Sequence, residues 1–199
     1  IRKSTAGKTG WFGFAVPFLG SMKKKSILDL ERISQQEFKQ VDKIPLIVVL
    51  DHVRSLNNVG SVFRTGDAFR IESVYLCGIT ATPPHPDIHK TALGAEDSVA
   101  WSYFEDACEA VDKLHDEGYT VYAIEQVEDS LNLANLQLDR TKKYAVVLGN
   151  EVKGVQQAVV DKCDQSIEIP QFGTKHSLNV SVTAGLVIWD FFKQLSGCL

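Results

Sequence analysis

Two runs of consecutive apolar residues constrain the fold most strongly. Residues 46–50 read Leu-Ile-Val-Val-Leu, and residues 144–148 read Tyr-Ala-Val-Val-Leu. A strand with one face in solvent alternates polar and apolar side chains. A run without polar side chains therefore indicates a strand buried on both faces, as in the middle of a parallel sheet. Further strands are predicted at residues 73–77, 98–101, 119–124 and 166–169.

Segments in which apolar residues recur at helical spacing lie between these strands. One of them, 104–117, is followed by Gly118, as a helix that ends in a glycine C-cap would be. Strands that alternate with helices predict an α/β fold, with a mostly parallel sheet and helices on both faces. Polar loops are predicted at 57–61 and 80–86. The predicted helices span residues 26–41, 62–69, 104–117, 155–162 and 178–195.

The first 21 residues look foreign to this domain. They have no clear hydrophobic period, and Gly20-Ser21 precedes Met22, the only methionine of the chain. Because Gly-Ser-Met is a common remnant of a cloning junction, residues 1–21 are predicted to be vector-derived. A natural basic arm is the alternative. Residues 22–199 show no internal repeat and are expected to form a single domain.

Composition narrows the class of protein further. The net charge is −4, which is unusual for a nucleic-acid binder unless basic side chains gather on one face. The apolar runs are too short to span a membrane. The four cysteines are widely spaced, and Pro86 interrupts the pair His85 and His89, so no metal site is expected. Reduced thiols in the cytoplasm are the simplest interpretation, although spacing alone does not exclude disulfides.

Three polar loops follow predicted strands. They span residues 57–64, 149–154 and 170–179. Ligands of open parallel sheets bind beyond the carboxyl ends of the strands, so these loops are candidates for one shared site. Gly149 and Gly154 flank the second loop, where glycine allows positive φ or close approach of the backbone to a ligand.

Taken together, the three loops resemble the SpoU/TrmH family of SPOUT RNA 2′-O-ribose methyltransferases. The first motif is Asn-Asn-Val-Gly-Ser-Val-Phe-Arg-Thr at 57–65, and the second is Leu-Gly-Asn-Glu-Val-Lys-Gly at 148–154. The third runs from Ile-Pro-Gln at 169–171 to Ser-Leu-Asn-Val-Ser-Val at 177–182. Their order and separations match the family over about 140 residues, from Leu46 to Trp189.

The resemblance implies features that hydrophobic periodicity does not show. It implies a C-terminal deep trefoil knot, which is otherwise nearly absent from proteins. It also implies a homodimer that brings residues of both subunits to the site, and S-adenosylmethionine as the cofactor, held in the knot. By this resemblance, the cofactor-binding residues are Gln126, Gly149, Ile169 and Leu178.

The resemblance also assigns catalytic residues. Arg64 matches the family's catalytic arginine. Because guanidinium stays protonated in proteins, we expect Arg64 to hold the substrate phosphate and stabilise the developing alkoxide rather than act as a base. Asn58 is expected to orient the ribose or Arg64, although a simple helix cap would explain it too. Glu151 is expected to hold a neighbouring loop or Arg64, and Ser177 and Asn179 to order the knot and approach the reacting groups; ordinary loop hydrogen bonds are the alternative.

RNA is the expected partner, and transfer RNA is favoured over ribosomal RNA. The expected target is a nucleotide of the guanosine-18 type. We expect no separate RNA-binding domain before the predicted catalytic domain, and this expectation favours a small substrate. Two alternatives stay open: 2′-O-methylation of ribosomal RNA by the same chemistry, and a non-catalytic knotted RNA-binding module. Candidate contacts to the RNA backbone are Arg54, Arg70, Lys90, Lys153, Lys175 and His176.

Overall fold

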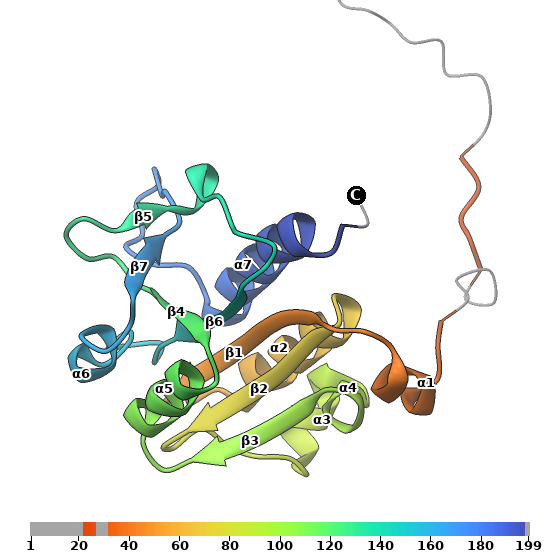
Figure 1. Ribbon diagram of the computed structural model, residues 1–199. Coiled ribbons are helices and arrows are strands. Elements are labelled where there is room, and N and C mark those ends of the chain that lie inside the picture. The colour runs from red at the N-terminus through yellow and green to blue at the C-terminus, as the bar shows by residue number, and fades with distance from the viewer. Residues whose placement is uncertain (1–21, 27–31, 198–199) are drawn as a thin grey trace, which may run out of the picture. The chain divides into compact units, whose positions relative to one another are not determined.

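The computed structural model describes residues 22–26 and 32–197. The chain divides into two units, residues 1–32 and residues 33–199. The described residues of the first unit form no helix or strand. The second unit contains every element described below (Figure 1). The prediction that residues 1–21 are vector-derived lies outside the described residues.

A seven-stranded sheet, parallel throughout, forms the centre of the second unit, with strand order β3-β2-β1-β6-β4-β7-β5. The predicted α/β fold with a mostly parallel sheet is therefore confirmed. The strands are β1 (Ile44–Asp51), β2 (Ile71–Cys77), β3 (Ala100–Phe104), β4 (Tyr119–Ile124), β5 (Leu131–Asn132), β6 (Lys143–Leu148) and β7 (Gln165–Glu168).

Helices cover both faces of the sheet, and the side chains of β1 show why. Leu46, Val48 and Leu50 pack into a core with α2 and α7, whereas Ile47 and Val49 pack on the opposite face with α5 and α6. Figure 1 shows α5 and α2 on opposite sides of the sheet. The helices are α1 (Gln35–Gln40), α2 (Leu56–Ala68), α3 (Pro86–Ala92), α4 (Ala95–Ser98), α5 (Ala107–Asp116), α6 (Gln157–Val160) and α7 (Val180–Leu195), with a 3₁₀ turn at Leu133–Asn135.

The predicted loop at 57–61 is wrong, because these residues form the first turns of α2. Ser55 caps the helix, and its side chain accepts a hydrogen bond from the backbone N–H of Asn58 at 3.3 Å. Gly60, which suggested a loop, allows a close helix contact instead. A Cβ at this position would lie 2.2 Å from Thr91 Oγ1 and 2.3 Å from the carbonyl oxygen of Ile88, both in α3.

The predicted helix at 26–41 is also wrong in length. The helix starts after Ser34, which forms a capping box with Glu37, and residues 32–34 are not helical. Residues 27–31 lie outside the described part of the chain. The pair Ser34 and Glu37 is a sequence signal for this helix start. The apolar residues before Ser34 recur at roughly helical spacing, and this spacing predicted an earlier start.

The C-terminal helix is tied to the segment that precedes β6. Gln194 of α7 accepts a hydrogen bond from the backbone N–H of Leu138 at 2.9 Å and donates one to the carbonyl oxygen of Leu136 at 3.2 Å. The deep knot itself stays a prediction.

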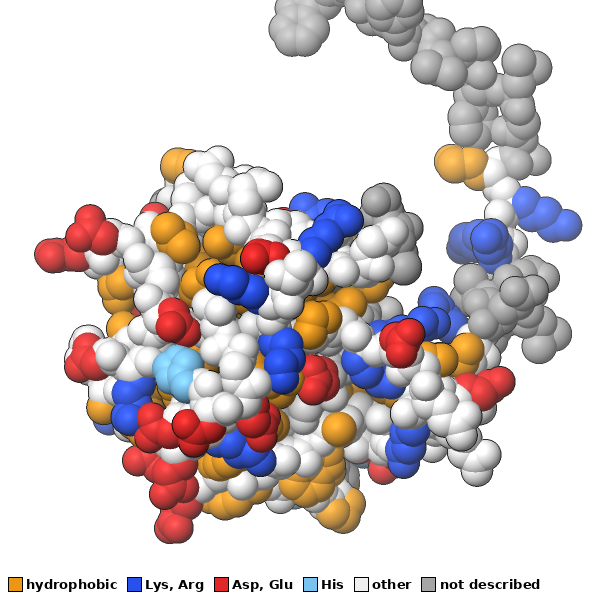
Figure 2. Space-filling model, in the orientation of Figure 1, with side chains coloured by type: hydrophobic (Ala, Val, Ile, Leu, Met, Phe, Trp, Pro, Cys, Tyr) orange, Lys and Arg blue, Asp and Glu red, His pale blue; other side chains and the backbone are white. Residues whose placement is uncertain are grey.

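Charged side chains are unevenly spread over the second unit. On the face shown in Figure 2, acidic side chains gather over and beyond α5, whereas lysine and arginine are more frequent around α7. The net charge of −4 therefore does not describe every face. No helix of the described residues has the length and apolar character needed to cross a membrane.

Candidate functional site

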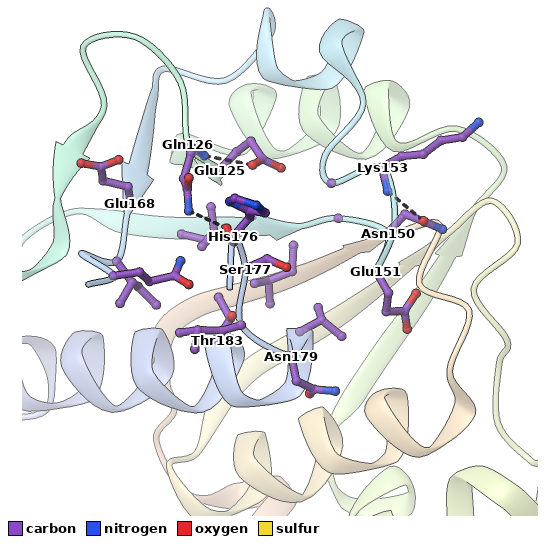
Figure 3. A pocket seen from close by; sticks show the side chains of 18 of the residues that line it. Glu125, Gln126, Asn150, Glu151, Lys153, Glu168, His176, Ser177, Asn179 and Thr183 are labelled. Carbon is purple, nitrogen blue, oxygen red and sulfur yellow. Dashed lines mark hydrogen bonds between the residues drawn. The ribbon is translucent and has the colours of Figure 1, made fainter. Parts of the chain in front are cut away.

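A cavity of about 530 Å³ opens at the carboxyl ends of β4, β6 and β7, beside the start of α7 (Figure 3). Volumes of this size are typical of small-molecule sites. The lining comes from residues 124–126 after β4, 148–154 after β6, 167–171 at and after β7, and 176–183 at the entry to α7. The second and third predicted loops therefore share one cavity.

The loop after β6 is shaped by glycines at both ends. Backbone hydrogen bonds of 3.0 and 2.9 Å join Asn150 to Gly154 and close the loop. A Cβ on Gly149 would lie 2.1 Å from the backbone of Gly154 and of Val155. Gly154 has φ +70°, and a Cβ there would lie 2.1 Å from Glu125 Oε2. The two glycines thus let the cavity wall fold tightly against itself and against β4.

Asn150 and its neighbours fix this loop to the end of β1. The Asn150 amide donates to the carbonyl oxygen of His52 at 2.8 Å, and its Oδ1 accepts from the backbone N–H groups of Val152 and Lys153. Asp51, fully buried at the end of β1, accepts from the backbone N–H and the side-chain amide of Gln156 at 3.0 and 2.9 Å. These bonds anchor both sides of the loop.

Glu151 joins the first motif to the second. Its carboxylate accepts hydrogen bonds from the backbone N–H groups of Arg54 and Ser55, both at 3.0 Å, and from the Asn58 amide at 3.1 Å. Burial acts to raise the pKa of Glu151. The hydrogen bonds outweigh burial and hold the pKa below its ordinary value of 4.5. Glu151 is therefore an ionised anchor for the backbone at Arg54 and Ser55, and its role in the site stays a prediction.

Asn179 joins the third motif to the first. Its side-chain amide donates to Asn58 Oδ1 at 3.2 Å. Its Oδ1 caps α7 through the backbone N–H of Ser181 at 2.9 Å. Together with Glu151, Asn58 and Asn179 form a chain of side-chain hydrogen bonds across all three motifs.

The loop after β7 passes over the cavity. Gln126 donates from its side-chain amide to the carbonyl oxygen of His176 at 3.2 Å, which links this loop to the end of β4. In Figure 3, His176 and Ser177 lie between Gln126 on one side and Glu151 on the other. Residues 172–179 are all exposed, whereas Val180 at the start of α7 is buried.

Two further carboxylates line the cavity, from Glu125 and Glu168. Glu125 accepts hydrogen bonds from the backbone N–H groups of Gln126 at 2.9 Å and Val155 at 3.0 Å. The apolar part of the wall comes from the strand ends and from Leu178. The cavity thus offers negative charge and an apolar surface to a ligand.

The four predicted cofactor-binding residues and three of the five predicted catalytic residues line the cavity. Asn58 is buried at its edge through the bonds to Glu151 and Asn179. Arg64 does not line the cavity, and it is exposed on α2. The cavity-lining members of the predicted set are Gln126, Gly149, Ile169, Leu178, Glu151, Ser177 and Asn179.

Three of the six predicted RNA contacts lie at the cavity or in a loop that lines it. Lys153 and His176 line the cavity, and Lys175 is exposed in the same loop as His176. In Figure 3, the Lys153 side chain extends away from the centre of the cavity. Arg70 precedes β2, and its backbone carbonyl oxygen accepts from the backbone N–H of Ile44 at 2.9 Å, so it lies at the amino ends of the strands, opposite the cavity.

The other two predicted RNA contacts are exposed. Arg54 lies between β1 and α2, and its backbone N–H holds Glu151. Lys90, on α3, forms an ion pair with Asp87 at 2.6 Å. A surface ion pair of this kind is weak enough to exchange for a phosphate.

His85 and His89, at which no metal site was expected, each have a hydrogen-bond partner within the protein. His85 caps α3 through the backbone N–H of Asp87 at 3.1 Å, and His89 Nδ1 lies 2.6 Å from Glu96 Oε1. Within residues 22–26 and 32–197, no group of three histidine, cysteine or carboxylate side chains could hold a metal ion.

Sequence reasoning missed several residues of the site. Glu125 is one residue past the predicted strand at 119–124, and Glu168 is the last residue of β7. Their position at carboxyl strand ends was a usable signal. Asp51 and Gln156 are 105 residues apart, and no sequence signal pairs them.

The fold and the site define a class of protein: a parallel α/β sheet with a small-molecule cavity at its strand ends. The second and third motifs line this cavity, and Glu151 and Asn179 join it to Asn58 of the first motif. Residues 45–189 match the model of the SpoU rRNA Methylase family. The chain belongs to this family, as the sequence resemblance predicted.

Individual relatives agree with this assignment. A Staphylococcus aureus protein described as a "Putative TrmH family tRNA/rRNA methyltransferase" is 29% identical over 166 residues, which cover 83% of this chain and 65% of that relative. The chain thus spans slightly less than two thirds of this relative's length. A solved A. aeolicus structure, a TrmH/SpoU tRNA modifying enzyme, is 26% identical with a TM-score of 0.70, covering 80% of this chain and 79% of its own.

A third relative shares the fold at lower identity. The SpoU methyltransferase AviRb from Streptomyces viridochromogenes, solved in complex with AdoMet, has a TM-score of 0.69 and 22% identity. The match covers 79% of this chain and 60% of that one. At this identity the likeness shows the fold alone.

Proposed function

We propose that this protein is an S-adenosylmethionine-dependent RNA methyltransferase that methylates a ribose 2′-hydroxyl, with transfer RNA as the leading substrate. One observation carries the proposal. The second and third family motifs line one cavity, and Glu151 and Asn179 connect it by hydrogen bonds to Asn58 of the first motif. Contacts among all three motifs are expected in a protein that uses the cavity, and a protein without a functional site would not require them.

The cavity suits S-adenosylmethionine in size and chemistry. The cofactor carries a sulfonium and an ammonium group, and Glu125 and Glu168 offer carboxylates in the cavity wall. Ile169 and Leu178 offer apolar surface for an adenine ring, and Gly149 lets backbone groups approach it closely. The binding of AdoMet by AviRb is consistent with this assignment.

When bound, the cofactor supplies a methyl group on sulfonium, which is already a good leaving group. The protein must chiefly align the ribose oxygen and assist loss of its proton. Asn58 is buried, and hydrogen bonds to Glu151 and Asn179 fix its side chain. Its side chain would therefore not have to change conformation when the substrate binds. Arg64 would hold the adjacent phosphate and stabilise negative charge on the oxygen, while the phosphate or a water accepts the proton.

We further propose that the enzyme is a homodimer and that Arg64 acts on the partner's cavity. Arg64 lies outside the cavity of its own chain. On α7, Val182, Leu186 and Trp189 are spaced so as to share one face, and they are 51%, 44% and 42% exposed. An exposed apolar stripe of this kind favours association. Since α2 packs beside α7, a second copy on this stripe would also lie near Arg64.

Mixing two inactive variants tests action in trans. Arg64→Ala removes the arginine. Gly149→Val displaces the cavity wall, because its Cβ would overlap the backbone of Gly154 and Val155, and it leaves Arg64 in place. If each cavity uses the partner's arginine, mixed dimers that carry one of each variant regain one complete site. Mixtures that stay as inactive as either parent, although the subunits exchange, would contradict the trans arrangement.

The substrate is tested by methyl transfer to bulk transfer RNA and bulk ribosomal RNA side by side. We expect transfer RNA to be the better acceptor. Transfer only to ribosomal RNA would refute that choice and leave the reaction class standing.

A non-catalytic RNA-binding module is the remaining alternative. It is separated from the enzyme by calorimetry with S-adenosylmethionine, which an enzyme must bind. Absence of binding at millimolar cofactor would favour the module. The cytoplasmic location stays a prediction.

A further inference from the structure

Phe172 is the most exposed large hydrophobic side chain of the described residues, at 97%. It lies in the loop over the cavity, between Gln171, which lines the cavity, and Lys175. We propose that Phe172 stacks on an unpaired base of the substrate RNA beside the ribose that is methylated. This inference rests on the proposed function and adds a specificity-determining contact to it.

The other described phenylalanines all have packing partners. Phe38, Phe63 and Phe191 are buried in the core. Phe69 and Phe192 pack against each other, with ring centres 5.2 Å apart, and Phe104 packs on Tyr75 at 4.8 Å. Phe172 differs from these phenylalanines, because its ring is exposed to solvent instead of packed against other apolar side chains. An aromatic ring held fully in solvent beside a ligand cavity fits a surface that a ligand completes.

The surroundings of Phe172 favour nucleic acid as the occupant. Lys175 is exposed three residues away, and His176 and Lys153 are exposed at the cavity wall. Val152, 77% exposed, adds a second apolar side chain from the loop after β6. Aromatic rings that stack on bases, interleaved with cations that meet phosphates, are the usual means of holding single-stranded nucleic acid.

The chemistry gives the ring a specific task. A nucleotide that leaves the regular stack of an RNA helix can bring its ribose hydroxyl further into the cavity, at a cost in stacking energy. A ring at the cavity mouth replaces part of that lost stacking. The protein should therefore prefer a nucleotide in a loop to one in a duplex, because an unpaired base can be splayed onto the ring.

Binding of a short oligoadenylate, and of the same strand with abasic sites, tests the contact directly. Phe172→Ala should weaken oligoadenylate binding about ten-fold, since a base stacked on an aromatic ring contributes at this level. Phe172→Trp should bind like the unchanged protein. The abasic strand should not distinguish the three proteins, because it offers no base to stack.

Matched controls separate stacking from loss of structure. Trp101→Leu removes an exposed aromatic ring from β3, at the opposite edge of the sheet, and should leave RNA binding unchanged. Phe172→Ala should keep its affinity for S-adenosylmethionine in calorimetry and its thermal stability, because the ring neither lines the cavity nor packs in the core.

Three results would overturn the proposal. They are equal oligoadenylate affinity for Phe172→Ala and the unchanged protein, no oligoadenylate binding at all, or dissociation of a dimer by Phe172→Ala, which would assign the ring to a second copy. Methyl transfer to bulk transfer RNA by the unchanged protein, in any of these cases, would leave the proposed function intact. Absence of transfer to transfer RNA would refute the substrate choice, and absence of transfer to ribosomal RNA as well would refute the proposed function.

Discussion

At the scale of single residues, Glu151 is the side chain on which separate segments converge. Its carboxylate accepts hydrogen bonds from the backbone between β1 and α2 and from the side-chain amide of Asn58. Asn58 Oδ1 in turn accepts a hydrogen bond from the side chain of Asn179, at the start of α7. We infer from these bonds that Glu151 keeps the three motifs in register.

Glu151→Gln tests this role. Glutamine has one oxygen in place of two, and its amide N–H groups would face the donor from Arg54 or Ser55. We expect the free energy of unfolding to fall by about 1 kcal/mol, a modest value because solvent reaches the carboxylate, and cofactor affinity to weaken. Chemical denaturation and calorimetry measure both. Glu128→Gln, in an exposed loop, is the matched control and should change neither.

The pH dependence of the same anchor has a defined sign. Folding lowers the pKa of Glu151 below its ordinary value of 4.5. Its contribution to stability is therefore fully present above that value and is lost as the pH falls through the lower folded pKa. The stability difference between the unchanged protein and Glu151→Gln should shrink on acidification below pH 4.5. A difference that grows on acidification would contradict the assignment.

Arg64→Ala separates binding from chemistry. Because Arg64 lies outside the cavity, S-adenosylmethionine affinity should stay the same, whereas methyl transfer should fall at least about 100-fold, as when one electrostatic donor is removed from an active site. Single-turnover transfer and calorimetry give the two readouts. Arg140→Ala, in the loop before β6, is the control. Near-normal transfer by Arg64→Ala would show that its assigned role is wrong.

At the scale of elements, apolar pattern predicted the sheet well and the short helices poorly. The strand runs at 46–50 and 144–148 are buried on both faces, so burial alone determines their pattern. α3 and α4 were not predicted, since each is at most seven residues long and offers too few apolar positions for a period. Residues 57–61 were read as a loop because asparagine and glycine favour loops, and the cap at Ser55 outweighs that preference.

Gly60→Ala tests the close contact of α2 with α3. Alanine favours a helix by about 1 kcal/mol over glycine, yet its Cβ would overlap atoms of Thr91 and Ile88. We expect the overlap to dominate and to lower stability by roughly 1–3 kcal/mol, measured as a fall in Tm. Gly173→Ala, where no atom lies within 4 Å of the added Cβ, should stay within about 0.5 kcal/mol. Stabilisation by Gly60→Ala would refute the contact.

At the scale of the whole molecule, the sequence predicted which loops meet but not how they are held. Parallel strands bring their carboxyl ends to one edge, which placed 149–154 and 170–179 together. The hydrogen bonds between Asp51 and Gln156, and those between Gln194 and residues 136 and 138, join segments far apart in the chain. Such pairings depend on the completed fold, and no local pattern encodes them.

Leu186→Glu tests the proposed dimer. A charge in the middle of the α7 stripe should shift the protein to monomer in sedimentation, because burying an unpaired carboxylate is costly. Methyl transfer should be lost with the dimer if Arg64 acts in trans. Ile79→Glu is the control, since Ile79 is 63% exposed in the loop after β2. A Leu186→Glu protein that stays dimeric would place the interface elsewhere.

The most direct test of the account follows the methyl group itself. The protein is incubated with S-adenosylmethionine labelled in the methyl group and with bulk transfer RNA, and the RNA is then digested to nucleosides. We predict label in a 2′-O-methylated nucleoside, and none with a Gly149→Val protein, in which the added side chain would displace the cavity wall at Gly154 and Val155. Label on a nucleobase, or transfer that survives Gly149→Val, would contradict the claim that this cavity presents the methyl donor to a ribose.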